Sequence, residues 1–245
     1  MSAVAALAPK RVGRLLLSDA MSIGRDPMLL FAIVLSVLPA IGFHLTQQQM
    51  DGAALAAFGV EQLSRYVAPV ALLVPAYLIG WVTGFLLLED RDDGPLAAIA
   101  VTPMGKGGFF AYRATVTALV TAAVTLLGLR LMVPEIGAAE AVLVLLLVPA
   151  GAVIAAVMLP AVARNKVEGL ALTKLINLGM FAPLLAIMPS PWRLLGGVVP
   201  SYWIGEALGL AEGRVLPLPV LVAAAVLVHL VWGIVLVRRF IRRPE

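Results

Sequence analysis

The sequence contains no cysteine and few charged residues, and these two shortages narrow its class. Without cysteine, disulfides and thiolate metal or redox sites are excluded. Only 13% of the 245 residues are charged, whereas 62% are hydrophobic and the mean hydropathy is +1.02. Because about a quarter of the residues in a soluble domain are charged, the composition indicates a polytopic membrane protein. The two histidines, His44 and His229, lie too far apart in sequence to suggest a histidine-rich metal site.

The short motifs that carry enzyme chemistry are also missing. There is no Gly-x-x-x-x-Gly-Lys-Ser/Thr, so a phosphate-binding P-loop is not expected. Residues 105–108, Gly-Lys-Gly-Gly, lack the earlier glycine and the following hydroxyl of that motif and are interpreted as a flexible loop. The absence of His-Glu-x-x-His and Gly-x-Ser-x-Gly argues against an intramembrane enzyme. We therefore expect no catalytic residue, metal or cofactor in this chain.

Six apolar stretches are present, and a bilayer-spanning helix takes about 20 residues. They are unbroken apolar runs rather than ten-residue strands of alternating polarity, so they predict an all-α integral membrane protein. Residues 1–245 are expected to form a single transmembrane domain. The expected spans are residues 28–45, 66–88, 112–133, 141–163, 170–188 and 218–237.

Lysine and arginine are unevenly divided between the two sides of these spans. Fourteen of the 18 fall in the N-terminal segment, around the loops after spans 2 and 4, and at the C-terminus. The other side has only Arg65, Arg130, Arg193 and Arg214. Because basic residues collect on the cytoplasmic side, both termini are expected there. The net charge of +4 thus reports topology, and no nucleic-acid partner is expected.

Residues 1–27 predict an amphipathic helix rather than a signal peptide, because Asp19 and Asp26 interrupt any apolar core. Apolar residues recur at helical spacing, while Arg11 and Arg14 fall on the opposite face. This pattern favours a helix that lies in the membrane interface against lipid headgroups. A cytosolic tail with chance periodicity is the alternative.

The loop between spans 2 and 3, residues 89–111, begins with four clustered carboxylates. A short helix is expected to follow, since Asp93 can cap it, Pro95 suits its first turn and Pro103 prevents its continuation. Its apolar side chains share one face, which is typical of an element that docks on another protein. An acidic loop folded back on the bundle fits the residues equally well.

This loop resembles the first cytoplasmic loop of ABC-2 type permeases. The residues that follow the family pattern in order and spacing are Glu89, Gly94, Leu96, Thr102 and Pro103. Pro95 and Ala97 depart from it, because the family usually has Thr and Glu there. Residues 166–172, entering span 5, and 200–203, before span 6, are also similar to the family. The chain resembles in particular the actinobacterial drug-export permeases of the fluoroquinolone-exporter type.

The resemblance implies an exporter subunit of the bacterial cell membrane without its own ATPase. Such a permease pairs with a second permease chain, identical or homologous, and with two ATP-binding subunits that hold ATP and Mg²⁺. Residues 1–27 would be the elbow helix, and the short helix of the 89–111 loop would be the coupling helix that inserts into the ATPase. The implied coupling residues are Glu89, Asp93, Gly94, Leu96, Ile99, Thr102 and Pro103.

Residues 189–217 join spans 5 and 6 on the outside, yet they stay apolar. Two short re-entrant helices interrupted by Gly196-Gly197 and Pro200 would explain this, because re-entrant backbone is tolerated where protein or a water-filled cavity covers it. The resemblance implies that such helices cap the exit of the pathway, whereas an interfacial aromatic belt is the alternative. The expected gate residues are Trp192, Tyr202, Trp203 and Glu206, with Glu206 and Arg214 bordering the exit.

Polar side chains are scarce inside the spans, and no Asp or Glu lies at mid-span. His229, in the middle of span 6, is expected to hydrogen-bond a neighbouring helix rather than relay protons. The resemblance implies that spans 1, 2 and 5 face the pathway and the dimer interface. Thr83, Asn177 and Met180 are therefore candidates to line the pathway, with ordinary helix packing as the alternative for each.

The sequence therefore predicts the permease subunit of an ATP-driven exporter of an amphipathic small molecule, such as a drug, lipid or secondary metabolite. An apolar pathway with few charges fits such cargo better than ions or sugars. An ion-coupled secondary transporter or a channel is the alternative. The absence of mid-span carboxylates counts against proton coupling.

Overall fold

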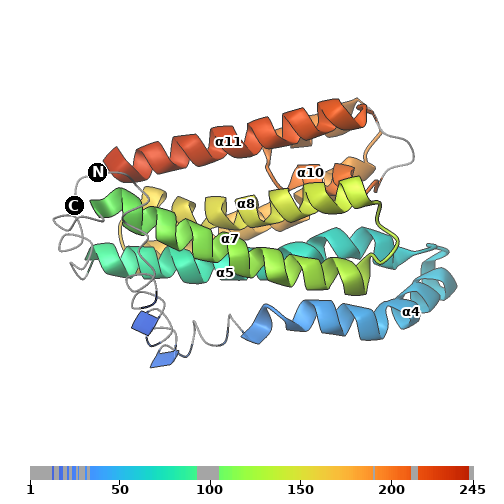
Figure 1. Cartoon of the computed structure of the whole chain (residues 1–245). Coiled ribbons are helices and arrows are strands. Elements are labelled where there is room, and N and C mark those ends of the chain that lie inside the picture. The colour runs from blue at the N-terminus through green and yellow to red at the C-terminus, as the bar shows by residue number, and fades with distance from the viewer. Residues whose placement is uncertain are drawn as a thin grey trace.

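The chain forms a bundle of long helices, shown in Figure 1. The computed structural model describes residues 34–92, 105–189, 191–210 and 215–242, with scattered positions between 13 and 31. These residues contain no β-strand, and most of the expected N-terminal helix lies outside them. The elements are α4 (Leu38–Phe58), α5 (Leu63–Asp92), α7 (Gly105–Met132), α8 (Ala138–Val162), α9 (Lys166–Leu178), the 3₁₀ helices η1 (Gly179–Ile187) and η2 (Trp192–Val198), α10 (Tyr202–Ala207) and α11 (Leu218–Arg242).

Five helices within the described residues are long and apolar enough to cross a membrane. They are α5, α7, α8, α11 and the continuous run Lys166–Ile187 formed by α9 and η1. These five correspond to the expected spans 2 to 6. The expected first span begins among residues that are only partly described, so its full length stays a prediction. The prediction of an all-helical chain with membrane-spanning helices is confirmed at this level.

α4 continues to Phe58, past Leu45, where the first span was expected to end. The run Gln47–Gln49 does not interrupt the helix, because glutamine has a good helix propensity. Gly59 ends it by adopting a left-handed conformation with φ of 65°, and its N–H donates to the Leu55 carbonyl at 3.0 Å. The glycine cap, rather than the polarity of the glutamines, therefore sets the end of this helix.

α5 and α8 form the centre of the bundle and approach each other closely. A Cβ atom on Gly80 would lie 2.7 Å from the Ala152 carbonyl oxygen, and one on Gly84 would lie 2.8 Å from that of Ala156. Each pair is four residues apart in its helix, so both pairs lie along one face. Small residues at this spacing let two membrane helices pack backbone against backbone.

The outer helices expose far more of their surface than the central pair. Of the most apolar 18-residue window of each helix, 67% is buried in α5 and 61% in α8, against only 22% in α11. Large apolar side chains such as Leu227, Leu230 and Ile234 of α11 are exposed outside the bundle. An apolar exterior around a packed centre is the arrangement expected of a chain whose solvent is lipid.

The fifth span changes from α-helix to 3₁₀-helix at Gly179, and Pro183 supplies the reason. Proline has no N–H, so Pro183 cannot donate to the carbonyl of Gly179 four residues earlier. That carbonyl instead accepts a 2.5 Å hydrogen bond from the Ser201 hydroxyl. The break in the span is therefore where the segment before α10 attaches to it.

Candidate functional site

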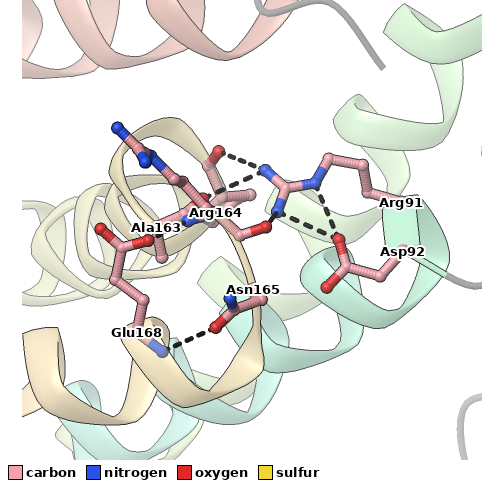
Figure 2. A network of polar contacts seen from close by, with 7 residues as sticks. Arg91, Asp92, Ala163, Arg164, Asn165 and Glu168 are labelled. Atoms are coloured by element: carbon pink, nitrogen blue, oxygen red, sulfur yellow. Dashed lines mark hydrogen bonds and ion pairs between the residues drawn. The ribbon is translucent and has the colours of Figure 1, made fainter.

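Polar side chains gather at the two ends of the bundle. One end, called here the basic end, is where α5, α8 and α11 finish and α7 and α9 begin. Arg91 of α5 donates there to the carbonyls of Pro160, Ala163 and Arg164 at 3.1, 3.2 and 2.8 Å. Figure 2 shows its guanidinium against the end of α8. A cation that satisfies these last carbonyls stabilises the helix terminus.

Arg239 of α11 donates to the Ala161 carbonyl at 3.0 Å, so α8 receives a second arginine at the same end. The following helix, α9, is capped by side chains: the N-cap Asn165 accepts from the Glu168 N–H at 2.9 Å, and Glu168 accepts from the Arg164 N–H, just before the cap, at 2.7 Å. Arginines from two other helices, α5 and α11, thus hold the end of α8, and the start of α9 is capped by its own side chains.

The acidic cluster at the end of α5 is paired with bases of the bundle. Asp90 binds Arg113 of α7 at 2.8 Å, and this arginine also lies over the Phe109 ring, with its guanidinium carbon 5.1 Å from the centroid. Asp92 contacts Arg91 at 3.1 Å. Glu89 lies 3.5 Å from Lys166 of α9. Asp90 and Glu89 thus connect α5 to α7 and α9, whereas Asp92 pairs within α5 itself.

The predicted coupling residues other than Glu89 lie outside the described part of the chain. They are Asp93, Gly94, Leu96, Ile99, Thr102 and Pro103. Their role in binding an ATPase therefore stays a prediction. Because α5 ends at Asp92 and α7 begins at Gly105, the segment that holds them is attached at the basic end.

At the opposite end, a buried ion pair forms the centre of the expected gate. Arg193 of η2 lies 2.9 Å from Glu206 of α10, with side chains only 4% and 5% exposed. The Tyr202 hydroxyl donates to the same carboxylate at 2.5 Å. Burial above all, and also the hydrogen bond to Glu206, raises the pKa of the Tyr202 phenol, so the hydroxyl keeps its proton. The sequence analysis chose Glu206 and Tyr202 as gate residues but missed Arg193.

Glycines make room for the aromatic rings of this gate. A Cβ atom on Gly196 would lie 2.7 Å from the Tyr202 ring, and one on Gly197 would lie 2.9 Å from the Trp203 ring. The Trp203 indole donates to the Gly197 carbonyl at 2.9 Å. The two glycines were expected to interrupt two helices, but both lie inside η2, and the interruption falls between Val198 and Tyr202.

The expected gate residues are not all brought together. Tyr202, Trp203 and Glu206 are buried in α10, whereas Trp192 is 67% exposed at the start of η2. Arg214 lies outside the described residues. A tryptophan that was not expected, Trp232 of α11, donates to the Val198 carbonyl at 2.9 Å and ties η2 to that helix.

The three expected pathway residues lie in different surroundings. Thr83 is buried between helices, and its hydroxyl lies 2.7 Å from that of Thr117 in α7. Asn177 has a buried Oδ1 with no hydrogen-bond partner among the described residues, and Met180 is half-buried against the core. None of the three lines either of the two cavities described next. Their role in the pathway stays a prediction.

Two apolar cavities lie in the membrane-spanning part of the bundle. The first, the lateral groove, has a volume of about 880 Å³ and lies between α7, α8 and α11. The second, the inner cavity, has a volume of about 310 Å³ and is lined by α5, α8, α9, α10 and α11. Ser201 and Ile204 of the gate segment line the inner cavity, so it lies directly beneath the gate.

His229 and Ile154 line both cavities. His229 is buried, and its Nδ1 lies 2.8 Å from the Ala225 carbonyl of the same helix. Nδ1 therefore bonds within α11, because a helical carbonyl four residues earlier is within reach of the ring. The Leu147 backbone of the neighbouring α8 also interacts with the ring, so the expected tie to a neighbouring helix stays a prediction.

Sequence reasoning also missed a polar stripe on α7. Thr117, Thr121 and Thr125 follow Arg113 at intervals of four residues, and all four side chains are buried. The four-residue spacing was a readable signal, because residues at that spacing share one helix face. Among the described residues no group of three His, Asp or Glu side chains could hold a metal ion.

Comparison with known proteins identifies the family. A family profile described as "Fluoroquinolones export permease protein Rv2686c-like" matches residues 19–237. Two curated proteins, fluoroquinolones export permease proteins MT2760 and Rv2686c from Mycobacterium tuberculosis strains CDC 1551 / Oshkosh and ATCC 25618 / H37Rv, are each 31% identical over 255 residues. The alignments cover 98% of this chain and 98% of each relative. No solved structure matches. The chain therefore belongs to the Rv2686c-like family of export permease proteins.

Proposed function

We propose that this chain is the membrane subunit of an ATP-driven exporter that moves an amphipathic small molecule out of the cell. Two ATP-binding subunits would be separate chains that hold the ATP and Mg²⁺, and a second permease chain, identical or homologous, would complete the membrane part. The observation that carries the proposal is a pair of apolar cavities inside a member of an export permease family.

The cavities favour an amphipathic cargo. The lateral groove is of the size of drug-binding pockets, about 300 to 1,000 Å³. Of the residues that line the two cavities, Arg238 is the charged one and lies at the edge of the groove. The relatives are named for the export of fluoroquinolones. A planar aromatic drug of that class is therefore the first cargo to test.

The energy source is proposed to lie outside the chain, because the sequence has no P-loop. We place the ATPase contact at the basic end, where the segment from Asp93 to Pro103 joins α5 to α7. The ion pairs of Glu89 and Asp90 connect the end of α5 to α9 and α7. Braced helix ends would transmit a movement of the connecting segment to the rest of the bundle.

The gate is proposed to close the pathway on the outside. Tyr202, Trp203 and Glu206 form a buried plug over the inner cavity, held by Arg193. Gly205 packs directly against the Pro183 backbone, where any side chain would collide. The plug is thus attached to the broken fifth span, and a movement of that span would move it.

Transport into inside-out membrane vesicles would test this function. The chain is produced together with its natural ATP-binding subunits, and uptake of a fluorescent fluoroquinolone is followed. We expect uptake to need ATP, to persist when ionophores collapse ion gradients, and to stop when the Walker lysine of the ATP-binding subunit is replaced. Uptake that needs no ATP-binding subunit and disappears with the ionophores would favour the ion-coupled alternative.

A further inference from the structure

The lateral groove is open along one side of the chain. Its floor is α8, and its walls are α7 and α11, which lie on either side of α8 in Figure 1. The groove is lined by Leu146, Leu230 and Ile234, and these side chains are also exposed on the lateral surface of the bundle. Near the basic end α7 and α11 meet, with the rings of Phe110 and Phe240 6.0 Å apart. A molecule dissolved in the membrane could therefore enter the groove from the side.

His229 lines both the lateral groove and the inner cavity, and its side chain is only 6% exposed. Among the described residues, Thr115 and Arg238 are the other polar side chains that line the groove. A molecule that moved from the groove to the space beneath the gate would therefore have to pass beside this buried ring.

The hydrogen bonding of the ring decides what it can offer to that molecule. The Ala225 carbonyl can only accept, so the Nδ1 that lies 2.8 Å from it carries the proton in a neutral ring. Nε2 is then an acceptor. The Leu147 backbone is also near the ring, but its carbonyl cannot donate. Among the described residues Nε2 has no hydrogen-bond partner.

A neutral ring is the form that this setting favours. Among the residues that the structure describes, no carboxylate lines either cavity to balance a charged imidazolium. A buried acceptor without a donor is costly, because it has lost its water and gained nothing in return. A ligand that brings a donor to Nε2 would remove this cost, whereas a purely apolar ligand would not.

We propose that His229 is a specificity-determining residue of the cargo site, and that it selects amphipathic molecules carrying an N–H or O–H donor. The apolar body of the cargo lies in the lateral groove, and its donor is held by Nε2 of His229 at the passage to the inner cavity. This inference rests on the proposed function, because the ligand it describes is the cargo of the exporter.

Binding to the purified chain in nanodiscs tests the proposal without ATP or partner subunits. The probes are 2-naphthol, which carries an O–H donor, and its methyl ether 2-methoxynaphthalene, which does not. The ratio of their Kd values in the variant His229→Phe gives the baseline from lipid partitioning. We expect the wild-type chain to favour 2-naphthol by about fivefold over that baseline, the size of one hydrogen bond.

Two variants separate the donor contact from a general disturbance. His229→Gln places an amide oxygen near the position of Nε2 and should restore part of the preference for 2-naphthol. His44→Phe makes the same exchange at the other histidine of the chain, whose Nδ1 lies 3.1 Å from the Leu131 carbonyl, and should leave the preference intact. Equal ratios in the wild type and His229→Phe would overturn the proposal.

A third variant tests the groove itself. A side chain on Gly233 would meet no atom within 4 Å at its Cβ, so Gly233→Phe can fill the groove without a clash at that atom. It should weaken the binding of both probes. If binding is unchanged in this variant, the probes bind elsewhere and the groove is not the site.

Nitrogen NMR gives a readout that does not depend on affinity. The chain has only two histidines, so ¹⁵N-histidine labelling resolves the ring of His229. We expect an unprotonated Nε2 whose resonance moves when 2-naphthol is added and stays in place with the methyl ether. A protonated Nε2 would overturn the assignment. If binding depends on the donor but ATP-driven export is not observed, the exporter proposal is wrong and the role of His229 stands. If export is observed but binding shows no preference for the donor, the role of His229 is wrong and the exporter proposal stands.

Discussion

Arg193 of η2 and Glu206 of α10 form an ion pair at 2.9 Å that is almost fully buried. The two residues come from consecutive short helices, and the Glu206 carboxylate also accepts a hydrogen bond from the Tyr202 hydroxyl. Removing one partner of a buried pair leaves the other charge without compensation, whereas replacing both by apolar groups often does little harm. This asymmetry makes the gate testable by a double-mutant cycle.

Glu206→Leu and Arg193→Met are each expected to lower the free energy of unfolding by about 3 to 5 kcal/mol. The double variant should be more stable than either single one, because no unpaired charge remains. Unfolding of the purified chain in detergent by a chemical denaturant measures all four forms. Additive losses in the double variant would show that the two side chains do not depend on each other.

Gly84→Ala is expected to destabilise the α5–α8 contact by about 1 to 3 kcal/mol, the usual effect of overpacking. Its Cβ atom would lie 2.6 Å from the Leu159 Cδ1 and 2.8 Å from the Ala156 carbonyl oxygen. The matched control is Gly42→Ala in α4, where a Cβ meets nothing within 4 Å and alanine is the better helix former. Thermal unfolding should separate the two, and equal melting temperatures would contradict the close packing.

Arg91→Ala is expected to fray the end of α8, because three carbonyls lose their shared donor. Hydrogen bonds to a charged group contribute about 1.5 to 3 kcal/mol, so amides in the last turn of α8 should exchange with deuterium faster. Arg130→Ala removes an exposed arginine of α7 and serves as the control. If the amides of the last turn of α8 stay equally protected in Arg91→Ala, then Arg239 and solvent are enough to satisfy the carbonyls at this helix end.

Ser201→Ala should destabilise the chain by about 1 kcal/mol, because the Gly179 carbonyl then loses the hydroxyl that donates to it. Pro183 cannot replace it, since proline lacks the N–H that a regular helix would supply. In the background Pro183→Ala the helix can supply that N–H, so the loss from Ser201→Ala should shrink. The free energies of unfolding of the wild type, the two single variants and the double variant measure this coupling. If Ser201→Ala costs as much in the Pro183→Ala background as in the wild type, the proposed connection between span 5 and α10 is wrong.

The polar groups at the two ends show where prediction from sequence succeeded and where it failed. The clustered carboxylates after α5 and the apolar loop before α11 were visible as local patterns. Their partners were not, because Arg113, Lys166 and Arg193 come from other elements and only folding brings them within reach. Gly196 and Gly197 were taken as helix breaks, although they serve as space for two rings.

The class of this protein can be read from the sequence alone: helices that cross a membrane, and membership of an export permease family. Hydropathy runs and glycine spacings are local, so they can be read along the chain. Which charges pair, where the cavities lie and that His229 lines both of them follow only from the packing of the helices. A single helix cannot enclose a space or satisfy a buried charge, so these features arise only when distant segments pack together.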